Sequence, residues 1–238
     1  MYNWLQLVNQ VLRRLREDEV TDVNATSYSK LIGTFINDAK REVENAWYWK
    51  SLNSTVRISV PATNETFFSL SSGSSYVVGS SYGNSRSKIL YDSSMRPMVY
   101  CTTPSKEYQL CEMYNLDMDS YQHLNPDALE MTDQNYFALS PSVATDEMRI
   151  RFRDYHLESR SYAVGMYTPQ ADFEDQTTVL LAPWRPVVHL ALIYALDERG
   201  EEIGEPGSKA WLRYETSLAD EVALDARYNS YRIHFTVP

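Results

Sequence analysis

The strongest pattern in this chain lies in its first fifty residues, which predict two amphipathic helices over residues 4–16 and 27–49, joined by an acidic elbow. The apolar residues of the first helix recur at spacings of three and four: Trp4, Leu5, Val8, Val11, Leu12 and Leu15. The second helix has an apolar stripe of Leu31, Ile32, Phe35, Ile36, Ala39, Val43, Ala46 and Trp47, with a polar back. Two such helices cannot hide both stripes on their own, so they require partners elsewhere in the chain.

From about residue 52 the apolar period changes from 3.6 to 2, which is typical of half-buried strands. The predicted strands are residues 55–60, 66–70, 76–78, 88–91, 98–102, 108–114, 136–139, 148–155 and 161–167. Clusters of Ser, Gly and Asn separate several of them and favour turns. Residues 51–177 are therefore expected to form an antiparallel β-rich module.

Helical patterns return after Pro183. Residues 186–199 are apolar nearly all round, which predicts a central buried helix, and Gly200 suits its C′ position. A fourth helix over 206–228 would bury Trp211, Tyr214, Leu218 and Val222. The predicted fold class is α+β: helix pairs 1–50 and 178–228 form a four-helix bundle, interrupted by the β module and followed by an extended segment, 229–238.

Charge and composition exclude several classes. The 22 basic and 32 acidic residues give a net charge of −10, which argues against a sequence-reading nucleic-acid binder. The excess of acid is largest in residues 51–177, with 16 acidic against 9 basic residues. No apolar run predicts a membrane span, and the first residues do not resemble a signal peptide. Cys101 and Cys111 are expected to be free thiols, the alternative being a cross-strand disulfide.

No pattern of catalytic, metal-ligating or cofactor-binding residues stands out. The four histidines are far apart in sequence, and the common nucleophile, phosphate-loop and zinc motifs are absent. His189 is interpreted as a core histidine that finds its hydrogen-bond partner inside the fold. Asp117 and Asp119 fit a pair of solvated carboxylates better than a glycosidase or calcium site. The sequence therefore predicts a protein that is not an enzyme.

Two segments are candidate interfaces. A period of two in residues 148–153 places Arg149, Arg151 and Arg153 on one face of a strand, where they would meet an acidic partner or pair with neighbouring carboxylates. Tyr231, Ile233 and Phe235 alternate in the last segment, which would add as a strand to a partner or close the chain's own sheet. The 18 tyrosines fit either an interface or ordinary strand propensity.

Residues 7–17 (LVNQVLRRLRE) and 28–47 (YSKLIGTFINDAKREVENAW) resemble head-to-tail adaptor proteins of tailed bacteriophages, the tail-tubular-A-like proteins of the virion neck. The order of a helix pair, a β region, returning helices and an extended C-terminal segment also resembles this family. The likeness is strong over residues 5–50, moderate over 178–228, and limited to the order of elements in the β module.

The resemblance implies a structural virion protein that assembles in the host cytoplasm into a homo-oligomeric ring, typically dodecameric. Such a ring lies between the portal protein and the tail nozzle and continues the DNA channel. A channel that does not hold phosphate would be lined mainly by acidic and neutral residues, with arginines at subunit boundaries. The alternatives are a tail accessory protein with a carbohydrate- or receptor-binding β module and, with less support, a glycan-degrading enzyme.

Overall fold

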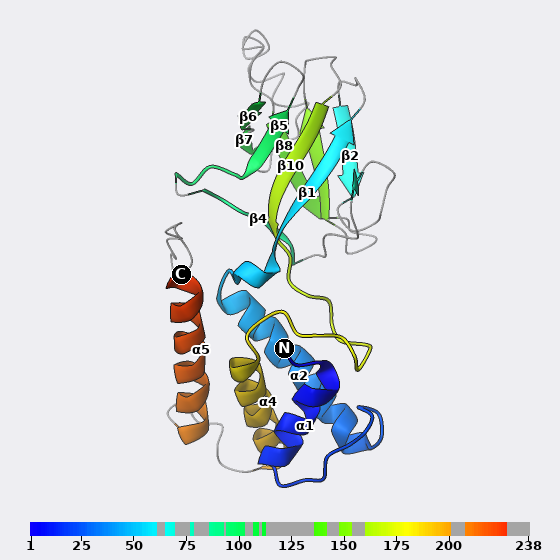
Figure 1. Ribbon diagram of the computed structural model, residues 1–238, viewed down its shortest axis with the longest axis vertical. Helices are drawn as coiled ribbons and strands as arrows, with labels where there is room; N and C mark the ends of the chain where they lie inside the picture. Colours follow the sequence, from blue (N-terminus) through cyan, green and yellow to red (C-terminus); the bar gives the residue numbers. More distant parts are fainter. Residues whose placement is uncertain are drawn as a thin grey trace. The chain divides into compact units, whose positions relative to one another are not determined.

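The computed structural model describes residues 1–60, 65–69, 77–78, 86–92, 94–102, 107–109, 111–112, 136–141, 148–153, 160–200 and 208–227 (Figure 1). These residues divide into a helical unit, formed by Met1–Leu52 and the chain from Gln170 onward to residue 227, and a β unit between Asn53 and Pro169. The mixture of helices and antiparallel strands confirms the α+β class.

The helical unit begins with α1 (Trp4–Arg14) and α2 (Ser27–Ala46), each with a capping box at its start. Asn3 caps α1 and exchanges hydrogen bonds with Gln6, while Thr26 caps α2 and does the same with Ser29. These bonds satisfy amide groups that a helix start leaves without intrahelical partners.

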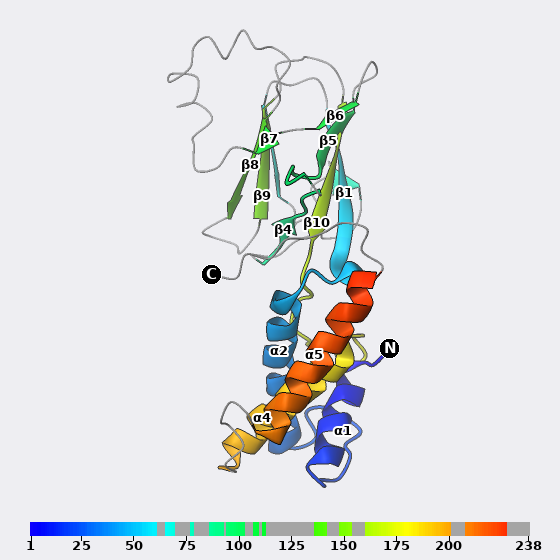
Figure 2. The same ribbon diagram turned by 90° about the vertical axis from the view of Figure 1, so that its left-hand side faces the viewer.

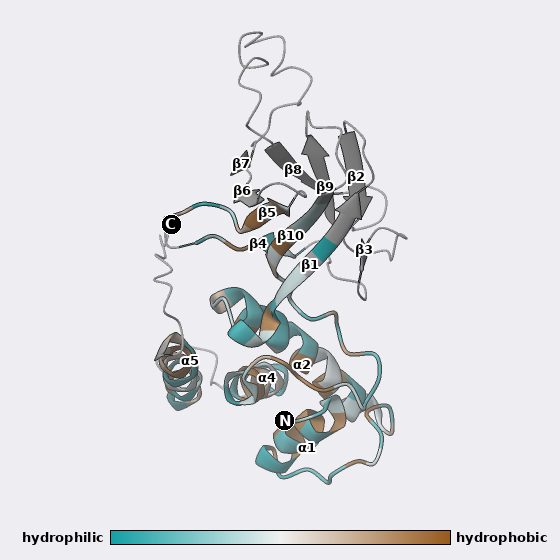
Figure 3. Ribbon diagram, turned by 45° about the horizontal axis from the view of Figure 1, so that its top comes forward, coloured by the Kyte–Doolittle hydropathy of each residue, from teal (hydrophilic) through white to brown (hydrophobic). Residues whose placement is uncertain are grey.

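The C-terminal half of this unit contains α4 (Trp184–Glu198) and α5 (Lys209–Arg227). Helix α4 packs against α1, α2 and α5. Its buried residues cover much of its circumference, but His189, Leu192 and Leu196 on one side are only half-buried, so the prediction of a helix buried all round is confirmed only in part. Gly200 follows it with φ +69°, a left-handed conformation that glycine adopts without a steric penalty. Figure 3 looks nearly along these helices and shows α4 between α5 and the α1–α2 pair.

Polar residues of α2 fix the segment where the chain returns to the helical unit. The Asn37 amide accepts from Phe173 N at 2.9 Å and donates to Phe173 O at 3.2 Å. Lys40 Nζ donates to the carbonyls of Gln170 and Ala171 at 2.7 and 2.9 Å. For this reason residues 170–177 belong to the helical unit, although the sequence pattern had placed them in the β module.

The same contacts correct the prediction of a polar back on α2. Lys40 and Glu44 have fully buried side chains, with Nζ and Oε1 3.7 Å apart. Glu44 also accepts a hydrogen bond from Gln170 N at 3.2 Å. The apolar stripe of α2 therefore continues into a buried ion pair that covers the returning segment.

In the β unit the larger sheet has the order β3-β1-β10-β5-β6, with β4 also paired to β10. Its strands are β1 (Asn53–Val60), β3 (Val77–Val78), β4 (Lys88–Ile89), β5 (Val99–Thr102), β6 (Glu107–Gln109) and β10 (Arg160–Tyr167). β1 and β10, which follow and precede the helical unit along the chain, pair over their full length from Asn53↔Tyr167 to Val60↔Arg160. Buried residues meet in register across this sheet, as in Tyr162↔Cys101 and Val164↔Val99. The side chain of Cys101 is buried.

A second sheet has the order β2-β9-β8-β7, with strands β2 (Glu65–Ser69), β7 (Cys111–Glu112), β8 (Tyr136–Pro141) and β9 (Met148–Arg153). The expectation of a wholly antiparallel module is wrong at one pair, because β7 runs parallel to β8. A long connection between residues 112 and 136 allows this direction, since parallel neighbours need a crossover rather than a tight turn.

Candidate functional site

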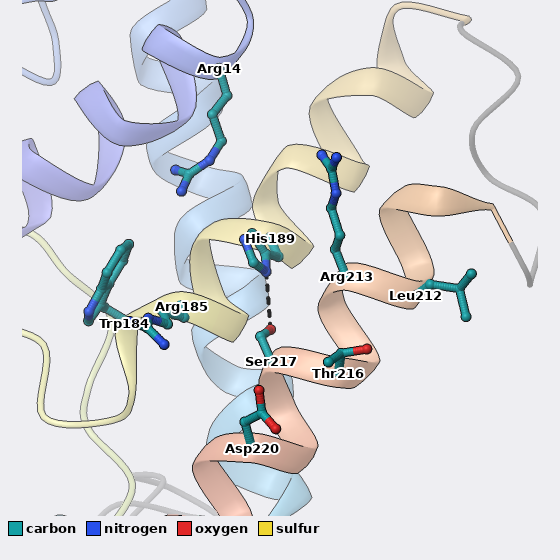
Figure 4. A pocket seen from close by; sticks show the side chains of 9 residues that line it. All are labelled: Arg14, Trp184, Arg185, His189, Leu212, Arg213, Thr216, Ser217 and Asp220. Atoms are coloured by element: carbon teal, nitrogen blue, oxygen red, sulfur yellow. Dashed lines mark hydrogen bonds between the residues drawn. The ribbon is translucent and has the colours of Figure 1, made fainter.

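A groove on the helical unit runs between the end of α1 and the outer helix α5, with α4 as its floor (Figure 4). It encloses about 460 Å³ and opens into a second hollow of about 460 Å³ that shares Arg14, His189 and Arg213. The residues that give this basic groove its charge are Arg14, Arg185, Lys209 and Arg213, and His189 lies among them.

The groove exists because α5 packs on the unit mainly through α4. Ser217 is the one buried residue among the described side chains of α5, whereas the sequence predicted burial of the whole stripe. Trp211, Tyr214, Leu218 and Val222 are only half-buried. In Figure 2, α5 crosses in front, with α2 on one side of it and α1 on the other. Each side of α5 is therefore a separate surface of the helical unit.

His189 is the only titratable group near neutral pH among the residues that line the groove. Its Nδ1 lies 3.1 Å from Ser217 Oγ, and Ser217 Oγ donates to Tyr214 O at 2.8 Å. Burial lowers the pKa of His189 and charge repulsion from Arg14 lowers it further, while a hydrogen bond with the backbone of Arg213 raises it. The prediction that His189 lies in the core is wrong, because its side chain is half-buried on the floor of the groove.

The cations of the groove have no carboxylate partner within the part of the chain that the structure describes. Arg14 donates to the Gln10 carbonyl at 3.1 Å, and Arg185 lies 5.9 Å from the centre of the Trp184 ring. Burial and the neighbouring Arg13 lower the pKa of Arg14. Asp220 is the single carboxylate among the lining residues, and it forms no ion pair with them. The described lining therefore carries a net positive charge, from four cations against the one carboxylate of Asp220.

The other side of α5, facing α2, is aromatic and acidic. Tyr194 lies 6.1 Å from the ring of Phe35, and Tyr214 lies 5.9 Å from the ring of Trp211. Burial, then the carboxylate of Glu42, Tyr214 and Asp38, raise the pKa of Tyr194 to about 12. The pKa of Tyr214 is raised by burial, Glu42 and Glu215. The acidic flank is defined here by Asp38, Glu42 and Glu215 around these two tyrosines.

Neither a metal site nor a membrane-spanning helix is found among the described residues. They contain no group of three or more His, Cys, Asp or Glu side chains placed to hold a metal ion. Nor does any helix among them have the length and apolar character needed to cross a bilayer.

The arginines that the sequence singled out lie on β9, an inner strand of the second sheet. Arg149 is opposite Ser69 and Ser140, Arg151 opposite Phe67 and Ala138, and Arg153 opposite Glu65 and Tyr136. Their strand and register are therefore known, while their side chains lie outside the described part. Tyr231, Ile233 and Phe235 lie outside the described residues, as do Asp117 and Asp119.

Sequence reasoning did not identify the basic groove, although a signal was present. Arg185 and His189 are four residues apart, as are Lys209 and Arg213. On a helix this spacing puts two cations on one face, where they repel each other unless a partner compensates them. Arg14 gave no such signal, because a cation in the last turn of a helix is already explained by the helix dipole.

Comparison with known proteins provides no relative: no family model matches the sequence, and no curated protein matches it. The class defined by the fold is an α+β protein whose helical unit has a basic groove and an acidic flank on either side of α5.

Proposed function

We propose that this protein is a head-to-tail adaptor of a tailed bacteriophage, a structural protein rather than an enzyme. In this role its copies form a homo-oligomeric ring, dodecameric by resemblance, between the portal protein and the tail nozzle. The ring continues the DNA channel in the neck of the virion.

One observation supports the proposal most strongly. The segments that resemble the adaptor family, residues 7–17 and 28–47, lie largely within helices α1 and α2 at the start of the chain. Both helices pack against α4. In the proposal the four described helices form a single four-helix bundle that provides lateral contacts between subunits. The β unit, inserted between the helix pairs, then faces the portal or the tail.

The charge of the chain supports this role. A net charge of −10 suits a channel through which DNA slides, because phosphate contacts with cations would hold the DNA in a salt-dependent way. We expect acidic and neutral side chains in the channel and arginines at subunit boundaries. Arg149, Arg151 and Arg153 of β9 are proposed as one partner-facing stripe, and residues 229–238 as an arm that contacts the portal.

The test is binding to the portal protein of the same genome, compared with binding to a panel of glycans. We expect the purified chain to co-sediment with the portal ring and not to bind the glycans. A chain that binds a glycan as a monomer and leaves the portal unoccupied would support the tail accessory protein instead. The β9 stripe is tested in the same assay by replacing its three arginines with glutamate; unchanged assembly would remove it from the interface.

A further inference from the structure

We infer that the basic groove of one copy of this chain receives the acidic flank of a second copy. The inference rests on the proposed function, since it names the two surfaces through which neighbouring subunits of the ring would contact each other. The occupant of the groove is then a second molecule of the same protein. The resemblance to the adaptor family did not predict this groove.

The first reason is the cationic charge of the groove. Arg185, Lys209 and Arg213 are exposed, and no carboxylate of the described residues pairs with them. Clustered cations repel each other because like charges interact unfavourably. An anionic surface that covers the groove would relieve this repulsion.

The second reason is the negative charge of the acidic flank, on the other side of α5. Glu42 and Glu215 are exposed and have no ion-pair partner among the described residues. Asp38 is 3.9 Å from Arg41, but that guanidinium already binds Asp172. The acidic flank therefore has the complementary property: Glu42 and Glu215 lack an ion-pair partner among the described residues, and Asp38 shares Arg41 with Asp172.

The third reason is the chemistry of the surrounding surface. Trp211, Tyr214 and Leu218 are half-buried beside the flank, and Leu212 at the groove is 52% exposed. Trp, Tyr and Arg are the residue types most enriched at the centres of protein interfaces. The two surfaces thus combine opposite charges with apolar area that an isolated monomer leaves in water.

The placement of the two surfaces suits a particular type of association. The groove lies on the α1 side of α5 and the flank on its α2 side, so a copy can offer its groove to one neighbour and its flank to another. Each copy then contacts two neighbours through unlike surfaces. Such heterologous contacts produce a closed ring when the rotation between subunits closes, and a filament when it does not.

The test uses two charge-reversed variants of the full chain. The groove variant is R185E/R213E and the flank variant is E42R/E215R; all four residues are exposed, so both should fold. R16E/K30E and D18R/D197R are the matched controls, because they change the net charge equally at exposed positions outside the two surfaces. Circular dichroism verifies the fold, and sedimentation equilibrium at low salt, up to about 1 mM protein, measures self-association.

We expect the wild type and both controls to self-associate, and high salt to weaken this association. Each variant alone should have a dissociation constant at least about tenfold higher, a change worth about 1.4 kcal/mol. A mixture of the two variants should assemble again, because the reversed groove of one matches the reversed flank of the other. Native mass spectrometry should then find the two variants in alternation, in equal numbers.

A wild type that stays monomeric over this range would overturn the inference, as would variants that associate like the controls. The inference also fails if a DNA duplex binds the groove of a monomeric protein and R185E/R213E abolishes that binding. Portal binding is measured separately. If portal binding persists while the variants associate normally, only this inference fails. If the mixed variants assemble but the protein does not bind the portal, only the proposed function fails.

Discussion

At the scale of single residues, Lys40 and Glu44 form the buried ion pair on which the return of the chain depends. Replacing Lys40 with Met would leave Glu44 buried without its cation and two backbone carbonyls without their donor. We expect a loss of about 3–5 kcal/mol in the free energy of unfolding, measured by urea denaturation. Lys30→Met, at an exposed position of the same helix, should change it by less than about 0.5 kcal/mol.

The double variant Lys40→Met/Glu44→Met separates the ion pair from general packing. Because it removes both buried charges, we expect it to cost less than the sum of the two single changes. Strictly additive costs would show that the two side chains do not stabilise each other.

His189 makes the stability of the helical unit depend on pH. Burial first, and then the charge of Arg14, lower its pKa in the folded protein below the unfolded value. The unfolded chain therefore binds more protons as the pH falls below about 6.5, and stability is lost on the acid side of that value. We expect His189→Gln to reduce the fall in the urea midpoint between pH 7.5 and 5.5. An unchanged fall would mean that other groups cause the acid sensitivity.

At the scale of elements, Gly33 determines how closely α1 crosses α2. A Cβ atom at this position would lie 2.9 Å from both Trp4 Cζ2 and Val23 Cγ1, which are buried, and Trp4 Nε1 donates to the Gly33 carbonyl at 3.3 Å. Gly33→Ala should therefore destabilise the protein by about 1–3 kcal/mol, despite the better helix propensity of alanine. Asn45→Ala, on the exposed side of α2, is the control and should be close to neutral in the same urea titration. Equal stability of the two variants would contradict the close crossing.

The elements themselves were predictable because their signals are local. Apolar periodicity located the four helices, and alternation with turn residues located the strands. Gly200 was identified by capping chemistry alone. The pairing of strands was not local. Nothing near residues 111 and 136 indicates that β7 and β8 are parallel neighbours in a second sheet, since pairing depends on contacts between distant segments.

Burial was harder to predict than helicity for the same reason. Periodicity shows which face of α5 is apolar but not how much of it a neighbour covers, so its stripe was expected to be buried and is half-buried. Lys40 and Glu44 were assigned to a polar face because their partners, residues 170 and 171, are more than a hundred positions away. The basic groove was missed because Arg14, Arg185 and Arg213 come from three helices.

At the scale of the whole molecule, the proposed arm makes a prediction of its own. Deleting residues 229–238 should weaken binding to the portal at least about tenfold, since a strand added to a partner contributes main-chain hydrogen bonds as well as side-chain contacts. Replacing Tyr231, Ile233 and Phe235 with Ser keeps the length of the segment and should produce a similar loss. Undiminished binding in a pull-down would mean that this segment belongs to the chain's own fold.

The proposal that this protein is a ring-forming adaptor is tested most directly by the mass of the complex that it forms with the portal protein. Native mass spectrometry of the mixture should find a portal ring carrying a fixed complement of this chain, twelve copies for a dodecameric portal. Portal rings that remain unoccupied beside free monomers, at concentrations where both proteins are folded, would contradict the account.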